Sequence, residues 1–508
     1  MYANGLPRNP SQRSQASQDW TDSNQSTRRN SAESRRSLHA GQDWAPLGRG
    51  VMSSSNNINN NNNNNGSYKN TNDMADKYGR SDNEKVSRAP GYDAEVPGFH
   101  DSHVGQQHQH EQQQQQQQHQ DDHHGHDHAG SQVDIYDPNR PKLGFKQRLH
   151  HFTWAWYTLP MSTGGLSLLI FAQPHQFPGL RSIGLAVYII NILIFTAVTA
   201  LMAARFMLHP GDMAASVKHP REGFFLPTFF LAVATLITST NRYAIPPNDV
   251  GLVWAIQGAF WAYVVATLLL AIGQYSFVFA AHSFTLNTMM PTWILPIFPI
   301  MLSGTIASVI AATQPEIVAV PIIVAGLTCQ GLGFSVALMM YAHMVGRLMQ
   351  AGLPNREHRP GLFMCVGPPA FTALAVIGMA SGLPKNVDPD MDGRMFDQGI
   401  IRTIALMSAI FLWALSLWWF GIAFVAVIQS PPKYFHLGWW AMVFPNTGFI
   451  LATITIGNEL GNEGVKWVAT GMSILLLIVY FFVFYSQVRA ILSQDIMYPG
   501  RDEDVEDH

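Results

Sequence analysis

The chain has 508 residues, of which 47% are hydrophobic and 13% are charged, and its formal net charge is −3. These averages hide two unlike parts, because residues 1–150 contain 16 of the 31 Lys and Arg and 17 of the 34 Asp and Glu. The longer remainder is poor in charge, which excludes an ordinary soluble multidomain protein. Neither part is basic, which excludes a nucleic-acid-binding protein that depends on net charge.

The amino-terminal segment, residues 1–144, is predicted to be a disordered tail. It is rich in Ser, Asn, Gln and His, with unbroken runs at Asn59–Asn65 and Gln112–Gln118. Such a composition cannot bury enough apolar surface to offset the entropy lost on ordering. Nine histidines between His100 and His128 suit either metal binding or a solvated low-complexity tract, and the composition favours the second.

Ten apolar stretches follow the tail, each of about 20 residues, which is the length needed to cross a bilayer as a helix. The sequence therefore predicts an all-α membrane domain over residues 145–490, followed by a short acidic tail over 491–508. The expected spans are 152–171, 183–204, 224–241, 251–272, 291–313, 316–342, 361–382, 400–428, 438–458 and 464–488.

The Lys and Arg of the short connections predict the orientation of the spans. Twelve lie on the side that carries both termini and six on the other, so both termini are expected in the cytoplasm. The six are Arg181, Arg242, Lys385, Arg394, Arg402 and Lys466.

Helix-breaking residues alternate along the spans. Proline in a lipid-facing helix leaves a carbonyl unpaired, so such irregularity belongs where protein or a water-filled cavity surrounds it. The odd spans are therefore predicted to be inner, kinked helices, in five hairpins around a central pore, with Pro321 of the sixth span as a partial exception. The expected kinks are at Pro160, Pro227, Pro299, Pro368 and Pro445.

Charge is confined to the ends of the spans, and this favours an anion as substrate. No Asp, Glu, Lys or Arg occupies the middle of a span, whereas Arg205, Arg242 and Arg402 lie near span ends. Arginine pairs with carboxylates through two parallel hydrogen bonds, although each of these side chains could instead extend to the membrane interface. Arg242 has the strongest case, because it ends a hydroxyl stripe on the third span. That stripe is Thr228, Thr235, Thr238 and Ser239, whose hydroxyls could also bond to their own helix.

No enzyme, metal site or cofactor is predicted. The two cysteines, Cys329 and Cys365, both lie in apolar runs. The histidines in or beside spans form no HxxxH or HExxH box, which disfavours a membrane enzyme, and ten spans disfavour a seven-helix receptor. These histidines are His150, His151, His282 and His343.

Six separated segments carry a family resemblance. They are RLHHFTWAWYTLPMSTGG (148–165), HPREGFFLPTFFLAVATLITS (219–239), PTWILPIFPIMLSGTIA (291–307), VPIIVAGLTCQGLGF (320–334), RPGLFMCVGPPAFTALA (359–375) and GWWAMVFPNTGFILAT (438–453). In this order they resemble the fungal malic-acid transport proteins, in the wider family of bacterial tellurite-resistance proteins and plant guard-cell slow anion channels. The resemblance covers about residues 145–490.

The resemblance implies ten helices in five hairpins, with the odd helices lining a pore in each subunit of a homotrimer. It also implies a pore-blocking phenylalanine at Phe444 and transport of malate and related four-carbon dicarboxylates across the plasma membrane. The substrate is expected to pass hydroxyls and an amide near the kinks, namely Ser162, Thr163, Thr372 and Asn446. An anion channel or a sulfite exporter of the same fold is the alternative.

The direction of transport stays open. The membrane interior is negative, and each negative charge that enters costs about 2.3 kcal/mol per 100 mV. Uptake therefore favours a monoanion or a species carried together with protons, whereas export of the dianion runs down the potential.

Overall fold

The computed structural model describes residues 141–501, apart from 247–249, 283–284 and 385–397. In this part the chain forms α-helices and 3-10 helices and no strand, which confirms the all-α prediction there. The expected amino-terminal tail lies outside the described residues except for 141–144, and so do Lys385 and Arg394.

Five inner helices share one form, in which a short 3-10 segment leads into an α-helix. The 3-10 segment and the α-helix are contiguous or one residue apart, so each pair acts as one rod that changes pitch part-way. The pairs are η2 (Trp154–Tyr157) and α4 (Thr158–Phe171), η3 (Glu222–Phe225) and α7 (Pro227–Tyr243), η5 (Pro291–Ile297) and α9 (Phe298–Ile310), η7 (Arg356–Val366) and α11 (Gly367–Ser381), and η8 (Leu437–Met442) and α13 (Phe444–Glu459).

Five longer helices alternate with these along the chain and run as continuous rods. They are α5 (Leu180–Leu208), α8 (Val250–Ala281), α10 (Glu316–Ala351), α12 (Gln398–Gln429) and α14 (Glu463–Leu492). In their most apolar stretches only 17–33% of residues are buried, against 67–89% for the inner rods of α7, α9, α11 and α13. The predicted alternation of inner and outer helices is thereby confirmed.

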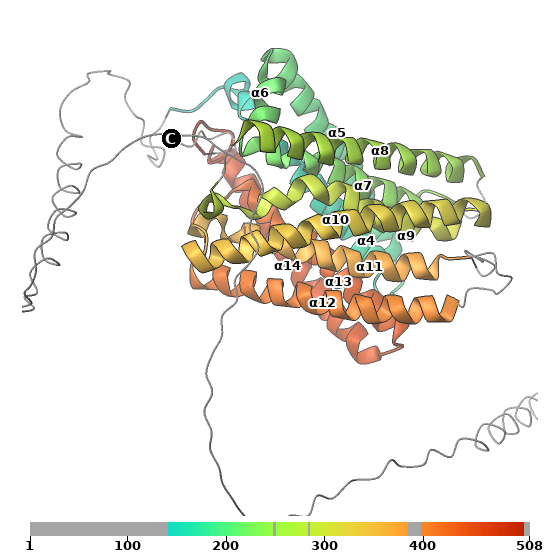
Figure 1. Ribbon diagram of the computed structural model, residues 1–508. Helices are drawn as coiled ribbons and strands as arrows, with labels where there is room; N and C mark the ends of the chain where they lie inside the picture. Colours follow the sequence, from blue (N-terminus) through green and yellow to red (C-terminus); the bar gives the residue numbers. More distant parts are fainter. Residues whose placement is uncertain (1–140, 247–249, 283–284, 385–397, 502–508) are drawn as a thin grey trace, which may run out of the picture. The chain divides into compact units, whose positions relative to one another are not determined.

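The inner helices form a closed ring. Helix α4 packs against α7, α7 against α9, α9 against α11, α11 against α13, and α13 again against α4. Each outer helix packs on the inner helix that precedes it in the chain, as Figure 1 shows for α10 beside α9 and α12 beside α11.

The predicted kink prolines all lie in the first turn of an α-helix. Pro227 is the first residue of α7, and Pro299, Pro368 and Pro445 are the second residues of α9, α11 and α13. Pro160 is the third residue of α4. Proline is tolerated in a first turn, because the N–H it lacks has no intrahelical partner there. The prolines therefore mark where each 3-10 segment becomes an α-helix, rather than a bend in a continuous α-helix.

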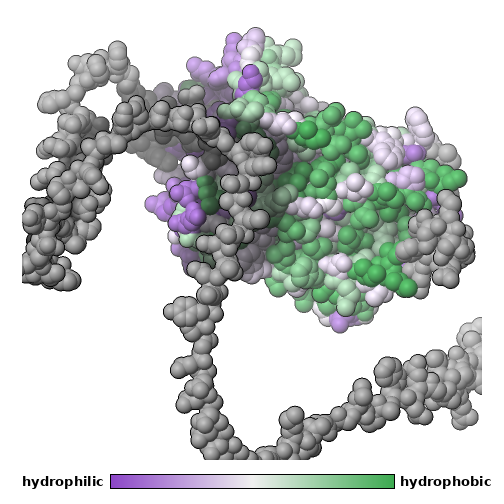
Figure 2. Space-filling model, viewed as in Figure 1, coloured by the Kyte–Doolittle hydropathy of each residue, from purple (hydrophilic) through white to green (hydrophobic). Residues whose placement is uncertain are grey.

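In the described part of the chain, nine helices are long and apolar enough to cross a membrane. The first expected span, 152–171, corresponds to η2 and α4 and is not among the nine. It is enclosed by other helices, since 11 residues of α4 are buried, including hydroxyls that would be costly against lipid. Apolar side chains cover the outer helices, and Figure 2 shows hydrophilic surface gathered at the end that carries α6 (Asp212–Lys218). The protein is a multi-pass membrane protein.

Both ends of the described domain lie on one face. The backbone N–H of Leu143 donates to Oε1 of Gln494 at 3.0 Å, and Arg148 of the short helix α3 (Phe145–His150) donates to the carbonyl of Ile491 at 2.8 Å. Beyond α14, where a polar tail was expected, Ile496, Met497 and Tyr498 are buried against the domain. The folded domain thus extends past its predicted boundary at residue 490.

Candidate functional site

Three cavities follow one another inside the helix ring. The largest, which we call the vestibule, has a volume of about 540 Å³ and opens between the 3-10 segments. Its volume lies within the range of about 300–1,000 Å³ usual for small-molecule sites. It is lined by Pro220, Arg221, Phe224, Phe225, Thr285, Asn287, Thr288, Met290, Pro291, Thr292, Trp293, Glu357, His358, Gly361, Met364, His436 and Gly438.

Two smaller cavities lie deeper, each of about 20 Å³, which holds about one water molecule. The proximal cavity is lined by Thr158, Met161, Phe225, Thr228, Leu231, Leu295, Phe298, Met364, Ala441, Phe444 and Pro445. The distal cavity is lined by Gly165, Leu168, Ala234, Thr235, Thr238, Leu302, Thr305, Ile306, Phe371, Phe444, Thr447 and Leu451.

Shared lining residues place the cavities in series. Phe225 and Met364 line both the vestibule and the proximal cavity, and Phe444 lines both the proximal and the distal cavity. The Phe444 ring therefore separates the two deep cavities. Because neither cavity has room for a dicarboxylate, this conformation is closed.

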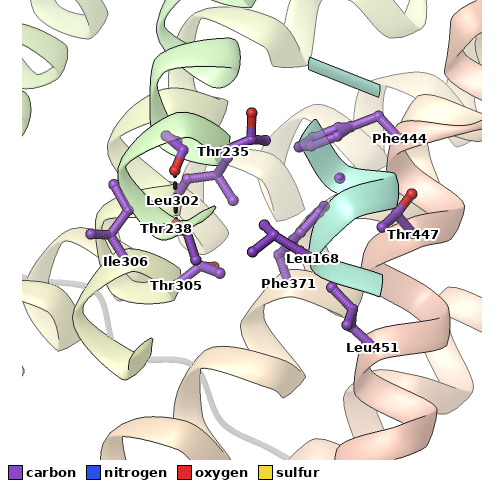
Figure 3. Close-up of a pocket in the computed structure, with 12 residues that line it drawn as sticks. Leu168, Thr235, Thr238, Leu302, Thr305, Ile306, Phe371, Phe444, Thr447 and Leu451 are labelled. Carbon is purple, nitrogen blue, oxygen red and sulfur yellow. Dashed lines mark hydrogen bonds between the residues drawn. The ribbon is translucent and has the colours of Figure 1, made fainter. Parts of the chain in front are cut away.

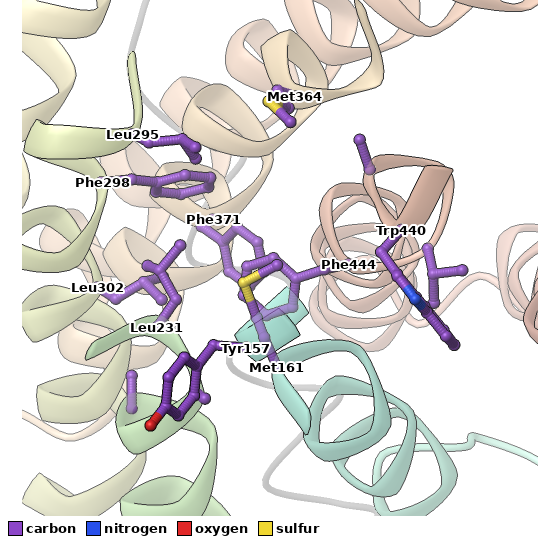
Figure 4. Close-up of a cluster of buried hydrophobic side chains, with 14 of the residues drawn as sticks. Tyr157, Met161, Leu231, Leu295, Phe298, Leu302, Met364, Phe371, Trp440 and Phe444 are labelled. Atoms are coloured by element: carbon purple, nitrogen blue, oxygen red, sulfur yellow. The ribbon is translucent and has the colours of Figure 1, made fainter. Parts of the chain in front are cut away.

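Three phenylalanines from three inner helices form the block, which we call the aromatic plug: Phe298, Phe371 and Phe444. The Phe444 ring stacks on Phe371 at a centroid distance of 5.1 Å and lies 6.2 Å from Phe298, and the Phe298 and Phe371 centroids are 5.9 Å apart. Phe444 is 1% exposed. Figure 4 shows the three rings converging, with Met161 beside them. Such aromatic pairs contribute about 0.5–1.5 kcal/mol each beyond their buried area, so the plug resists opening without being fixed.

Each ring of the plug is seated on a glycine of a neighbouring inner helix. A Cβ on Gly165 would lie 3.3 Å from the Phe444 ring, one on Gly367 would lie 2.5 Å from Phe298, and one on Gly448 would lie 2.6 Å from Phe371. A side chain at Gly367 or Gly448 would overlap the ring. The glycines therefore set where the rings sit.

Four threonines line the distal cavity. Thr235, Thr238 and Thr447 each donate their hydroxyl proton to a carbonyl of their own helix, at 2.8, 2.7 and 3.0 Å. Oγ1 of Thr305 is buried and has no hydrogen-bond partner among the described residues. Thr305 can therefore donate to an anion without breaking a bond. Figure 3 shows Thr235, Thr238 and Thr305 on one side of the cavity and Phe444, Thr447 and Leu451 on the other.

The expected hydroxyl stripe on the third span faces the pathway over most of its length. Thr228 lines the proximal cavity, and Thr235 and Thr238 line the distal one. Ser239 instead bonds to Ser167 of α4 at 3.1 Å.

The four side chains expected near the kinks line none of these three cavities. Thr163 bonds to the Tyr480 hydroxyl of outer helix α14 at 3.0 Å, and Thr372 accepts from Gln330 of outer helix α10 at 2.7 Å. Asn446 donates to the carbonyl of Met442 at 2.8 Å. Oγ of Ser162 is buried without a partner among the described residues. Thr163 and Thr372 therefore join inner helices to outer helices in this conformation, whereas Asn446 bonds within its own rod.

Arg205 is engaged in a buried ion-pair cluster. Its Nη1 lies 2.6 Å from Oε1 of Glu222 and donates to the carbonyl of Phe152 at 2.9 Å, and its Nε lies 3.4 Å from Oδ2 of Asp212. The side chains of Arg205 and Glu222 are only 5% and 2% exposed. The charge of Arg205 is therefore neutralised by the ion pair that joins α5 to η3, and it is not available to an anion in this conformation.

Arg402 and Arg242 differ in their partners. Arg402 pairs with both carboxylate oxygens of Glu459, at 3.1 and 3.0 Å. The Arg242 guanidinium lies 5.4 Å from the centre of the Phe171 ring, and Arg181 lies 5.3 Å from the same ring. Within the described residues neither Arg181 nor Arg242 has a carboxylate partner. Arg242 lies on the same face of α7 as Thr235 and Thr238, in the last turn of the helix. It is therefore at the end of the hydroxyl stripe.

The deep cavities and the vestibule differ in charge. The residues that line the two deep cavities are all uncharged, whereas the vestibule is lined by Arg221, Glu357, His358 and His436. Burial lowers the pKa of His436 to about 4, helped by His358 and Arg501 and opposed by Glu357. His436 is therefore neutral near pH 7.

Comparison with known proteins agrees with this architecture. Residues 151–488 match the voltage-dependent anion channel family, which is most of the chain and includes every inner helix. The chain belongs to this family. It is 36% identical over 368 residues to a malic acid transport protein of Schizosaccharomyces pombe, covering 72% of this chain and 84% of that protein.

Two further relatives carry different names. A putative malic acid transport protein of the same yeast is 33% identical over 370 residues, covering 72% of this chain and 86% of its own. A sulfite efflux pump of Trichophyton rubrum is 25% identical over 341 residues, covering 66% of this chain and 90% of its own. Both names describe transport.

Proposed function

We propose that this chain transports malate and related four-carbon dicarboxylates across the plasma membrane. The observation that carries the proposal is the series of vestibule, proximal cavity, aromatic plug and distal cavity inside a ring of five broken helices. The identity of 36% to a malic acid transport protein supports the choice of substrate.

The pathway that we propose runs along the ring axis. A dicarboxylate gathers at Arg242 and Arg181 on one face or in the vestibule on the other, and it crosses when Phe444 swings aside and joins the two deep cavities. Thr235, Thr238 and Thr305 then donate hydroxyl hydrogen bonds to the anion. Thr235 and Thr238 can rotate away from the carbonyls that they bond to in their own helix, and Thr305 has no such bond to break among the described residues. An uncharged path lets an anion leave as readily as it enters.

The topology that we propose has ten crossings with both termini in the cytoplasm. Nine helices of the described residues qualify as spans, and the bonds between the two ends of the domain on one face support an even number of crossings. The rod of η2 and α4 is the tenth crossing. The exposed apolar side chains of the outer helices suit both lipid and the subunit contacts of a homotrimer.

The proposal is tested with purified protein in proteoliposomes. Radiolabelled malate should enter faster than in empty vesicles, unlabelled malate should compete better than sulfite or chloride, and an acid-outside gradient should speed uptake if protons accompany the anion. Flux of sulfite above that of malate would instead assign the chain to the sulfite branch. Absence of flux for all three anions would contradict transport by this pathway.

A further inference from the structure

We propose that His150, His209 and Asp212 form a binding site for a divalent transition-metal ion of the zinc class, outside the transport pathway. Each residue offers one ligand atom, and the three atoms lie within 4.8 Å of one another. Nδ1 of His150 is 2.8 Å from Oδ2 of Asp212, and the rings of His150 and His209 are 4.8 Å apart. Ligand atoms about 2.0–2.2 Å from one tetrahedral zinc ion lie about 3.3–3.6 Å apart, so small side-chain rotations would bring these three atoms around an ion.

The ligands come from three separate elements. His150 is the last residue of α3, His209 follows α5 as its cap, and Asp212 is the first residue of α6. A search for paired histidines at helical spacing misses such a set, because the fold and not the local sequence brings the residues together. Only two residues separate His209 from Asp212, in a turn in which Gly211 adopts a φ of 102°.

The donor types match the ion. Two imidazoles and one carboxylate are a usual set for Zn²⁺ with one position open to water. The Nε2 atom of His209 is buried and has no hydrogen-bond partner among the described residues, so one imidazole nitrogen has no protein bond to lose. The side chain of His150 is 48% exposed and that of Asp212 is 15% exposed, which gives an ion a route in from solvent.

The local charge also suits a cation. Arg205 brings one positive charge close to Asp212, at 3.4 Å, but Glu222 binds the same guanidinium and is its closer partner. With neutral imidazoles, the cluster of Arg205, Glu222 and Asp212 carries a net charge of −1. The two carboxylates of this cluster thus outnumber its single guanidinium.

Binding would tie together the segments that lead into the first inner rod. Helix α3 precedes η2 by a few residues, and α5 and α6 flank the buried ion-pair cluster. An ion at this site therefore stabilises the packing of α3 on α5 and α6, and the folded domain as a whole, through linkage of binding to folding.

The test measures thermal unfolding of the helical domain in the full chain. Metal bound by histidines of the amino-terminal segment should not change the Tm of that domain. Added Zn²⁺ should raise the Tm of the wild-type protein, and a chelator should reverse the rise. His209→Gln and His150→Gln should remove the rise. His343→Gln should keep it, because His343 lies on α10 and bonds there to Met339 of its own helix. Equal rises in wild type and His209→Gln would overturn the proposal.

A second measurement places the ion directly. In His209→Cys loaded with Co²⁺, a thiolate-to-cobalt absorption band should appear only if the ion sits at position 209. Wild-type protein should lack the band, because Cys329 and Cys365 are buried. Adding Asp212→Asn to His209→Cys should weaken cobalt binding at least tenfold. Absence of this band in His209→Cys at saturating Co²⁺ would refute the site, whatever Co²⁺ the amino-terminal histidines bind.

Discussion

Among the three arginines predicted at the pathway mouths, only Arg242 has a guanidinium without a carboxylate partner in the described structure. Arg205 is bound to Glu222, and Arg402 to Glu459. We expect Arg242→Gln to raise the malate concentration that gives half-maximal flux about tenfold, through loss of about 1.4 kcal/mol of binding. Arg402→Gln should change that concentration by less than about twofold, since its charge is already paired. Concentration series in proteoliposomes measure both, and equal effects of the two substitutions would contradict the recruiting role.

His436 predicts how stability depends on pH. Its pKa is about 4 in the folded protein and near 6.5 when unfolded, so between these values the unfolded chain binds the extra proton. The contribution of His436 to stability is therefore complete above about pH 6.5 and declines as the pH falls toward 4. Thermal unfolding between pH 4 and 7 should show a smaller loss of Tm for His436→Gln than for wild type. An unchanged pH profile would mean that His436 does not carry this dependence.

The residues that face the pathway could be predicted only in part. The stripe of Thr228, Thr235 and Thr238 could be recognised in the sequence because α7 also has partly exposed, apolar positions. Its polar face therefore differs in composition from its remaining surface. Helices α4, α11 and α13 are buried on nearly all sides. Their sequences therefore have no periodicity that distinguishes side chains facing the pathway from side chains facing a neighbouring helix. This is why Thr163 and Thr372 were expected at the pathway, whereas the structure turns them toward outer helices.

At the scale of helices, the glycine seats of the plug make a direct prediction. Gly448→Ala places a Cβ 2.6 Å from the Phe371 ring, so either the ring or α13 must move. We expect a loss of about 1–3 kcal/mol in stability, together with altered malate flux. Gly471→Ala on outer helix α14 is the matched control, because a Cβ there meets nothing within 4 Å. Thermal unfolding and malate flux should be measured for both variants. Equal changes in the two variants would contradict the claim that Gly448 positions the Phe371 ring.

The buried pair of Arg205 and Glu222 joins α5 to η3. Arg205→Met removes the guanidinium that the buried Glu222 carboxylate binds at 2.6 Å, which should cost about 3–5 kcal/mol of stability. The double variant Arg205→Met, Glu222→Met should recover most of this loss, because it removes both charges. Thermal unfolding of the single and double variants separates this structural role from substrate binding. If the single variant keeps its stability and loses malate affinity, Arg205 binds substrate after all.

The alternation of helix breakers predicted which helices are inner, and the structure bears this out. Proline and glycine need neighbours that satisfy the freed backbone groups, and this requirement is readable from sequence. The 3-10 form of the first part of each rod was not predicted. Proline in a first turn is compatible with a bend, a helix start or a change of pitch, and tertiary packing decides among them.

At the scale of the whole molecule, the charge pattern and the helix ring describe one design. Charged side chains lie at the two ends of the bundle, the outer helices present apolar surface, and the deep cavities between the inner helices are lined by uncharged residues. Composition could predict this separation, because lipid and a solvated end demand different side chains. The ring closes where α13 packs against α4, two segments far apart in the sequence. Local sequence patterns could not predict this contact.

The most direct test of transport through this ring compares malate flux in wild-type, Phe444→Ala and Phe449→Ala proteins in proteoliposomes. Phe444 separates the two deep cavities, whereas Phe449 on the same helix is equally buried but packs against Trp413 and Phe420 of α12. We predict that Phe444→Ala raises malate flux well above the wild-type level and that Phe449→Ala does not. Unchanged flux in a correctly folded Phe444→Ala protein would contradict a pathway along the axis of the ring.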